Sequence, residues 1–183
     1  MASGTRRRWP AAIAVVAFAA CSARSPQTAR QADERIAHVG QPAPSWSEPT
    51  SAGTNLALKS LRGKVIYLNF FATWCPPCNE EAPAIEGLQR EFAGKGLQVV
   101  GVDVLENAHK AQLFRSEHRL SYPAVVDDGA LRDQYAVNGL PVHVFIDRGG
   151  IVRNIIVGEL SMTDMRANIR RLLQDEKDSS ASN

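Results

Sequence analysis

The sequence contains only three cysteines, Cys21, Cys75 and Cys78, among its 183 residues. A metal site built on thiolates usually needs four ligands, and no second closely spaced cysteine pair is present to complete one. No cluster of methionines or histidines accompanies the thiols, so the sequence gives no support for a dedicated copper site. The formal net charge of +2 is small and gives no case for nucleic-acid binding.

Long apolar stretches are also missing. The run from Ala11 to Ala20 is unbroken, but a helix needs about twenty apolar residues to span a bilayer. The three arginines Arg6–Arg8 precede this run, and small residues follow it. The pattern is typical of a signal peptide, which we place at residues 1–20.

The composition of the chain is that of an ordinary globular protein, with 44% hydrophobic and 22% charged residues. Its length fits one domain with a tail or two. Residues 21–38 hold few apolar side chains, which favours a flexible tether. We expect one folded domain over residues 39–175 and a polar, disordered tail over residues 176–183.

The centre of the sequence is a strand followed by two cysteines and a helix. The apolar run from Val65 to Phe71 predicts a buried strand. Cys75 and Cys78 stand at the start of the next element, which helical spacing predicts from Ala82, Ile85, Leu88 and Phe92. Two thiols so close in sequence can form a disulfide, and the helix N-terminus lowers the pKa of the first. Pro76 suits the first helical turn, which needs no N–H from it.

This arrangement predicts thiol–disulfide exchange, in which Cys75 attacks and Cys78 resolves the mixed disulfide. A metal site or a structural disulfide is the alternative interpretation of the pair. The metal site lacks further cysteine ligands, and a disulfide that closes so short a loop stabilises little. The pattern therefore favours a redox function.

The segment Phe-Phe-Ala-Thr-Trp-Cys-Pro-Pro-Cys, residues 70–78, resembles the thioredoxin superfamily and more narrowly its exported TlpA/ResA/DsbE branch. The resemblance covers residues 39–173. It implies an α/β thioredoxin fold with a central mixed β-sheet flanked by helices and an N-terminal β-hairpin extension. We expect the hairpin around Trp46, Leu56 and Leu58, with its turn at Ser51–Asn55. The resemblance implies no cofactor and no metal.

The resemblance also assigns roles around the dithiol. Thioredoxin has a buried Asp where this chain has Asn69, and an amide cannot take up the proton of the second thiol. The TlpA/ResA branch instead tends to carry a Glu inside the helix, and Glu81 matches that position. Glu81 lies one helical turn after Cys78, so the two side chains can share a face. We therefore expect Glu81 to accept the Cys78 proton, whereas Glu80 is expected to be solvated.

Family members carry a cis-proline packed against the two cysteines, and the sequence Gly-Leu-Pro at 139–141 fits that pattern. Pro141 precedes a predicted strand, where a proline is otherwise awkward. We expect Leu140 and Pro141, with Trp74, Pro76 and Pro77, to shape the site where substrate docks. His143 stands where the family commonly has Thr, and the pattern does not favour a catalytic role for it.

The remaining elements follow from shorter patterns. His109 and His118 stand among charged neighbours and are expected to be solvated, and Pro83 matches a family helix kink. The predicted strands are Leu97–Asp103, Tyr122–Asp127 and Ile151–Val157, and the predicted helices are Glu106–His118, Leu131–Val137 and Thr163–Leu173.

Cys21 follows the sequence Phe18-Ala19-Ala20, which resembles the cleavage box of a bacterial lipoprotein. The third residue before the cysteine is usually Leu, and here it is Phe. Cleavage at Ala17-Phe18-Ala19 is the alternative and would leave Cys21 as a free thiol. Lipidation is favoured because an exposed free thiol would interfere with the redox pair.

The sequence thus predicts a thiol–disulfide oxidoreductase that reduces protein disulfides. It is expected in the bacterial cell envelope, facing the periplasm and anchored by lipid, or else as a soluble periplasmic protein. The resemblance implies apocytochrome c as a possible disulfide-bearing substrate and a DsbD or CcdA type membrane protein as electron donor. A peroxiredoxin-type peroxide reductase and a Cu(I)-handling protein remain alternatives.

Overall fold

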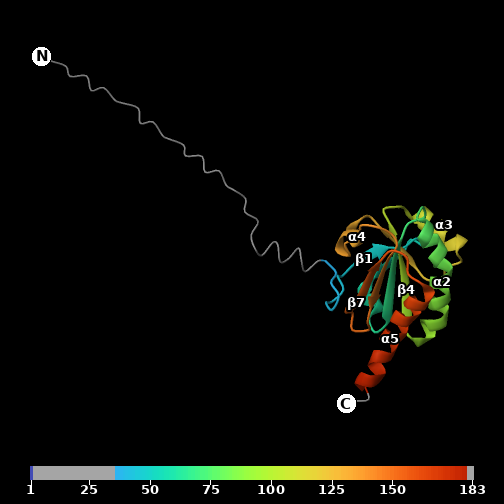
Figure 1. The fold of residues 1–183 in the computed structure, drawn as a ribbon. Coiled ribbons are helices and arrows are strands. Elements are labelled where there is room, and N and C mark those ends of the chain that lie inside the picture. Colours follow the sequence, from blue (N-terminus) through green and yellow to red (C-terminus); the bar gives the residue numbers. More distant parts are fainter. Residues whose placement is uncertain (2–35, 181–183) are drawn as a thin grey trace.

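The computed structural model describes Met1 and residues 36–180. Its centre is a five-stranded sheet with the order β5-β4-β3-β6-β7 (Figure 1). The strands are β3 (Val65–Phe71), β4 (Leu97–Val104), β5 (Ala124–Asp127), β6 (Val142–Ile146) and β7 (Val152–Val157). β3, β4 and β5 run parallel, whereas β6 pairs antiparallel with both β3 and β7. The predicted mixed sheet is therefore confirmed.

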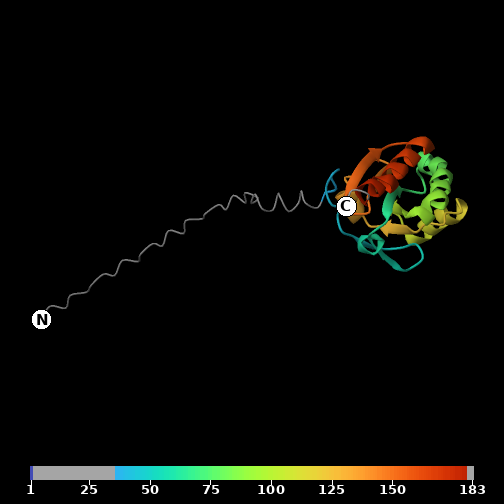
Figure 2. The ribbon, with the colours of Figure 1, turned by 90° about the horizontal axis from the view of Figure 1, so that it is seen from below.

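The two faces of the sheet are covered by different elements. Helices α2 (Pro76–Phe92), α3 (Ala108–Glu117) and α5 (Met162–Ser180) supply side chains to one core cluster, and α4 (Ala130–Gln134) supplies side chains to the other. Figures 1 and 2 show α2 and α5 side by side on one face of the sheet. Each fully buried Leu or Ile side chain in these layers contributes about 1.5–3 kcal/mol.

Strand β3 explains how both layers form. All seven of its residues are buried, and successive side chains point to opposite faces. Val65, Tyr67 and Phe71 belong to the cluster under α2, whereas Ile66, Leu68 and Phe70 belong to the cluster on the other face. A strand buried on both faces reads as a continuous apolar run, which is why its bounds could be predicted.

The N-terminal part of the described chain forms the expected hairpin. β1 (Ser47–Pro49) and β2 (Asn55–Ala57) pair antiparallel, and a 3₁₀ helix, η1 (Leu58–Leu61), leads to β3. The folded part begins before residue 39, because Ala37 is buried and its N–H donates to the Gln134 carbonyl at 2.7 Å.

Several element ends differ from the prediction. α3 begins at Ala108 rather than Glu106, because the Asn107 side chain caps it by accepting from the Lys110 N–H at 3.1 Å. α4 ends at Gln134, before the predicted end at Val137. A short 3₁₀ helix, η2 (Ala93–Lys95), follows α2. α5 continues to Ser180, into the segment predicted to be a disordered tail.

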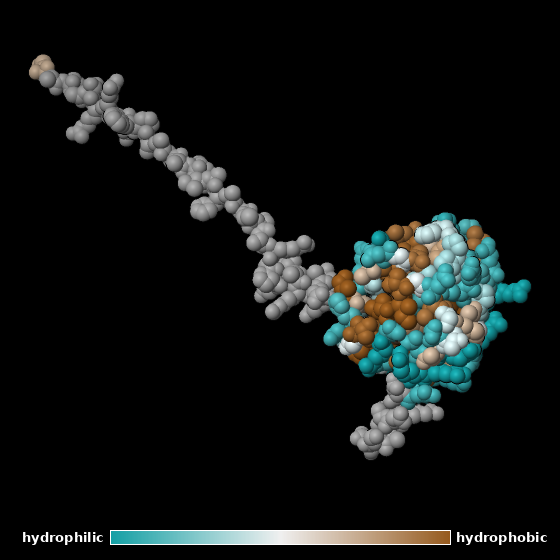
Figure 3. All heavy atoms as spheres, in the orientation of Figure 1, coloured by the Kyte–Doolittle hydropathy of each residue, from teal (hydrophilic) through white to brown (hydrophobic). Residues whose placement is uncertain are grey.

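Residues 2–35 and 181–183 lie outside the described part of the chain. The predicted signal peptide, Cys21 and most of the predicted tether fall in this range. Within the described residues, no helix has both the length and the apolar character to cross a bilayer. Figure 3 shows hydrophobic residues gathered in an area of one face of the domain, bordered by hydrophilic residues.

Candidate active site

The dithiol lies where strand β3 leads into helix α2. Cys75 is the N-cap of α2, Pro76 and Pro77 open the helix, and Cys78 follows on its first turn. The two cysteines form a disulfide with an S–S distance of 2.00 Å and a Cα–Cα distance of 5.3 Å. The Cys78 N–H donates to the Cys75 sulfur at 3.3 Å, so the helix N-terminus directs a donor at the first sulfur. That donor favours the Cys75 thiolate after reduction.

Hydrogen bonds fix the loop in front of the disulfide. The Thr73 N–H and hydroxyl donate to the two carboxylate oxygens of Glu106, at 2.6 and 2.8 Å. The Asn79 side-chain amide donates to the carbonyls of Thr73 and Cys75, at 3.1 and 2.8 Å. The backbone that carries Cys75 is thus held from both sides.

His118, the residue that caps the C-terminal end of α3, supports this loop, contrary to the prediction that it is solvated. Its ring is half-buried against Phe114, with centroids 4.5 Å apart, and its Nε2–H donates to the Asn79 side-chain oxygen at 3.0 Å. Only His109 of this pair of histidines is exposed. The charged neighbours in sequence gave no signal of the contact, because Asn79 is 39 residues away from His118.

A buried carboxyl lies behind the same loop. Asp103 is fully buried at the end of β4, and burial together with the neighbouring Glu106 raises its pKa to about 8. Neither oxygen of Asp103 has a hydrogen-bond partner in the described part of the chain, and a buried carboxyl without one is favoured in its neutral, protonated form. The pair therefore presents one negative charge to Thr73. No local sequence pattern marks this pair.

The Leu140–Pro141 peptide bond is cis, as the sequence predicted. Pro141 is buried, and its carbonyl accepts from the Gly158 N–H at 2.9 Å. Leu140 is half-buried, whereas Trp74 has 66% of its surface exposed. Both border a pocket of about 290 Å³, lined by Trp74, Val104, Leu105, Arg132, Val137, Asn138, Gly139 and Leu140.

Leu105 in this pocket was not predicted. It is 58% exposed and has a φ of 57°, a left-handed conformation that costs an ordinary side chain free energy. An exposed Leu held in this conformation beside Trp74 extends the apolar surface next to the dithiol. Pro76 is exposed and Pro77 is half-buried at the same end of α2.

Glu81 lies on the inner face of α2, whereas Glu80 is exposed. One Glu81 oxygen, Oε1, accepts from the Leu160 N–H at 2.6 Å. Burial raises the pKa of Glu81 to about 7, and the neighbouring Glu159 adds to the rise, although the hydrogen bond from Leu160 opposes it. A carboxyl with this pKa can take up a proton near neutral pH. α2 continues through Pro83.

Polar residues lie beneath α2 on the same face of the sheet. The Tyr67 hydroxyl donates to Nδ1 of His143 at 2.8 Å, and the Asn69 amide nitrogen is 3.5 Å from the same atom. Nε2 of His143 is 3.5 Å from Oε2 of Glu81. The structure thus joins the predicted Glu81 to His143, a residue that the sequence did not favour for a catalytic role.

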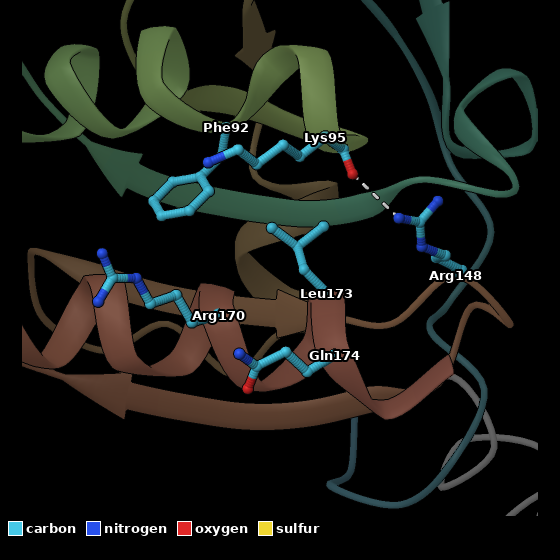
Figure 4. A pocket seen from close by; sticks show the side chains of 6 residues that line it. All are labelled: Phe92, Lys95, Arg148, Arg170, Leu173 and Gln174. Atoms are coloured by element: carbon cyan, nitrogen blue, oxygen red, sulfur yellow. Dashed lines mark hydrogen bonds between the residues drawn. The ribbon is translucent and has the colours of Figure 1, made fainter. Parts of the chain in front are cut away.

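A second pocket, of about 510 Å³, is larger than the one beside Trp74 but lies elsewhere. It is lined by Phe92, Lys95, Arg148, Arg170, Leu173 and Gln174 (Figure 4). Phe92 is the last residue of α2, so a 17-residue helix, about 25 Å long, separates it from Cys75. This pocket is not part of the redox site.

A disulfide at the N-terminus of the helix that follows β3, together with a cis-proline directly before the neighbouring strand β6 of a mixed five-stranded sheet, defines a thiol–disulfide oxidoreductase of the thioredoxin fold. The model of the AhpC/TSA family matches residues 39–155, and the chain belongs to that family. Within it, the chain is a thioredoxin-like protein of the TlpA/ResA/DsbE type.

Named relatives support this assignment. The chain is 34% identical over 133 residues to the thioredoxin-like protein YneN of Bacillus subtilis, covering 71% of this chain and 78% of YneN. It is 30% identical over 142 residues to the thiol-disulfide oxidoreductase ResA of Bacillus cereus, covering 77% and 82%. The crystal structure of a Chlorobium tepidum protein assigned as the thiol:disulfide interchange protein DsbE superimposes with a TM-score of 0.70 at 29% identity. That superposition covers 75% of this chain and 99% of the other.

Proposed function

We propose that this oxidoreductase reduces protein disulfides in the bacterial cell envelope, facing the periplasm and tethered to a membrane by lipid on Cys21. The observation that carries the redox part of the proposal is the Cys75–Cys78 disulfide at the start of α2. In the proposed reaction the enzyme acts in its reduced form, and the Cys75–Cys78 disulfide is its oxidised product.

The reaction follows from the positions of the two sulfurs. The Cys75 thiolate attacks one sulfur of the substrate disulfide, a mixed disulfide forms, and the first substrate thiolate leaves. Cys78 then loses its proton and attacks the Cys75 sulfur, which releases the second substrate thiolate. Two electrons pass from the dithiol to the substrate. A dithiol membrane protein of the DsbD or CcdA type is the proposed donor that reduces Cys75 and Cys78 again.

Apocytochrome c is the proposed substrate, because haem attachment needs both thiols of its Cys-x-x-Cys-His segment in the reduced state. The pocket beside Trp74 and the cis-Pro141 bond supports docking of an extended polypeptide next to the dithiol. Leu105 and Leu140 supply apolar surface for side chains that flank the substrate cysteines.

The test is a single turnover with a peptide. We expect the pre-reduced enzyme to reduce an oxidised Cys-x-x-Cys-His peptide, with the oxidised Cys75–Cys78 enzyme as the other product. Alkylation of free thiols followed by mass spectrometry measures both. A peptide with Ala in place of His serves as the matched control. Reduction of insulin without reduction of the haem-site peptide would contradict the apocytochrome substrate while leaving the reductase activity in place.

The two other classes are separated from this proposal by direct assays. A peroxide reductase of the peroxiredoxin type normally has a Thr and a Pro shortly before a single peroxidatic cysteine, whereas here Trp74 directly precedes Cys75 and Cys78 lies nearby. We expect peroxide to be consumed no faster than by a free dithiol, and we expect Cu(I) binding not to be required for insulin reduction. Rapid peroxide turnover, or activity that depends on copper, would replace the proposed function.

The membrane anchor gives a separate prediction about Cys21. Cys21→Ala is expected to move the protein from the membrane fraction to the soluble fraction, because acyl chains would be the anchor once the signal peptide is removed. Fractionation of cells and the intact mass of the mature protein provide the measurement, with Ser22→Ala as the control. Retention of Cys21→Ala in membranes, or an unmodified Cys21 in the mature protein, would rule out the lipoprotein.

A further inference from the structure

A histidine lies buried beneath the helix that carries the dithiol. His143 is the second residue of β6, and none of its surface is exposed. Its Nε2 lies 3.1 Å from the Gly158 carbonyl oxygen, and its Nδ1 lies 2.8 Å from the Tyr67 hydroxyl. A carbonyl oxygen can only accept, so in the neutral ring Nε2 carries the hydrogen and Nδ1 accepts from Tyr67.

The same Nε2–H lies close to Glu81. The distance from Nε2 to Oε2 of Glu81 is 3.5 Å, slightly longer than the distance to the Gly158 carbonyl. Oε2 is buried and accepts no hydrogen bond in the described part of the chain, whereas Oε1 is held by the Leu160 N–H. One N–H therefore lies near two acceptors, the Gly158 carbonyl oxygen and Oε2 of Glu81. Of the two groups, only the Glu81 carboxyl can change its charge.

We propose that His143 is a positioning residue for Glu81, and that its Nε2–H turns from the Gly158 carbonyl toward Oε2 when Glu81 ionises. The inference rests on the proposed reductase function and on the role expected for Glu81 as the acceptor of the Cys78 proton. The hydrogen bond to Oε2 supports the carboxylate that is needed before the resolving step. Once Oε2 holds the proton, the N–H returns to Gly158.

In the resolving step, one proton moves from Cys78 to Glu81 and one disulfide bond replaces another. The Cys78 S–H bond breaks, its electron pair stays on the sulfur, and the proton moves to Oε2 of Glu81. The Cys78 sulfur then forms the bond to Cys75, and the Cys75–substrate bond breaks with its electron pair on the leaving substrate thiolate. His143 neither gains nor loses a proton, so it acts on the reaction through Glu81 alone.

The groups around His143 favour this neutral role. Burial lowers the pKa of His143 to about 4, so the ring is neutral throughout the working range. The titratable groups that face His143 are Glu81 from α2 and Tyr67 from β3, and Glu159, in the segment after β7, acts on the Glu81 charge. Burial and the Glu81 charge raise the pKa of Tyr67 well above its usual value, so Tyr67 stays protonated. Between Tyr67 and Glu81, Glu81 is the group that changes its charge near neutral pH.

His143→Leu and His143→Gln test the proposal, because Leu cannot donate a hydrogen bond and the Gln amide can. In His143→Leu the Glu81 carboxyl should titrate about one pH unit higher, the shift expected for loss of one hydrogen bond to the charged form. The reduction rate below that midpoint should then fall up to about tenfold. In His143→Gln, the Glu81 midpoint and the reduction rate should both return most of the way to those of the unmodified enzyme. Carbon-13 NMR of the Glu81 carboxyl and pH–rate profiles provide the measurements.

A double-mutant cycle separates positioning from a purely structural role. In the Glu81→Gln background, His143→Leu should cause no further change in the pH profile. His109→Leu, at an exposed histidine, is the matched control and should leave the Glu81 titration unchanged. An unchanged Glu81 midpoint in folded His143→Leu, or an equal rate loss in both backgrounds, would overturn the proposal.

A measurement on the unmodified protein covers the case in which His143→Leu does not fold. The His143 Nε2–H resonance should move between pH 5 and pH 9 with the midpoint of Glu81, about 7. A resonance that stays constant over this range overturns the proposal. This titration tests the positioning role of His143 by itself. The proposed reductase function is tested separately by the insulin assay, so a failure of one can be told apart from a failure of the other.

Discussion

Cys75→Ser is expected to lower the rate of insulin-disulfide reduction to the uncatalysed background. The sulfur of Cys75 is the one that accepts the Cys78 N–H at the start of α2, so its thiolate is favoured and it is the attacking group. Serine has no accessible thiolate to replace it. Turbidity of reduced insulin, followed with purified protein and a chemical reductant, measures the loss.

Cys78→Ser should fail at a different step. Attack by Cys75 remains possible, but no second thiol resolves the mixed disulfide, so covalent enzyme–substrate complexes should accumulate. Non-reducing electrophoresis and mass spectrometry detect them. Cys21→Ala, assayed on purified protein, is the matched cysteine control and should retain the normal rate. A Cys78→Ser enzyme that turns over like the unmodified one would rule out the two-thiol mechanism.

The second large effect is expected at Glu81. Glu81→Gln should slow disulfide reduction about 100-fold near pH 7, the lower range for removal of a general base. Because burial raises the Glu81 pKa to about 7, the rate of the unmodified enzyme should rise as pH increases through that value. The variant should lack this inflection and keep only the titration of the thiols. Rates measured between pH 5 and pH 9 provide the comparison.

Glu80→Gln is the matched control for this prediction. Glu80 is the adjacent residue of the same helix, but its side chain is exposed. It points about 100° away from Glu81 around the helix axis. Its loss should change the rate little at any pH. If the pH–rate curves of Glu81→Gln and the unmodified enzyme coincide, Glu81 is not the proton acceptor.

The sequence predicts well those parts of the structure that are determined by residues close together in the chain. The bounds of β3 follow from an apolar run, and the start of α2 follows from Cys75 and the two prolines. Glu81 was predicted from the family resemblance, and its helical spacing to Cys78 supported the inward position that the structure shows. The cis bond before Pro141 was predicted from the family resemblance and is present in the structure.

The parts that sequence missed depend on distant contacts. His143 approaches Glu81 across 62 positions only because β6 pairs antiparallel with β3 under α2. His118 reaches Asn79, and Glu106 beside the buried Asp103 reaches Thr73, for the same kind of reason. No local pattern marks a polar side chain that will be buried by another element. An alternating pattern would place His143 on a face, but it would not identify its partner.

The midpoint potential of the Cys75–Cys78 couple tests the central claim most directly. The account predicts a value near that of thioredoxin, about −270 mV, because a protein that reduces disulfides must hold its own dithiol as the better electron donor. Equilibration with glutathione buffers, with alkylation and mass spectrometry of the two thiols, gives this number. A potential near −120 mV, as for the oxidant DsbA, would contradict the account and make the protein a disulfide donor.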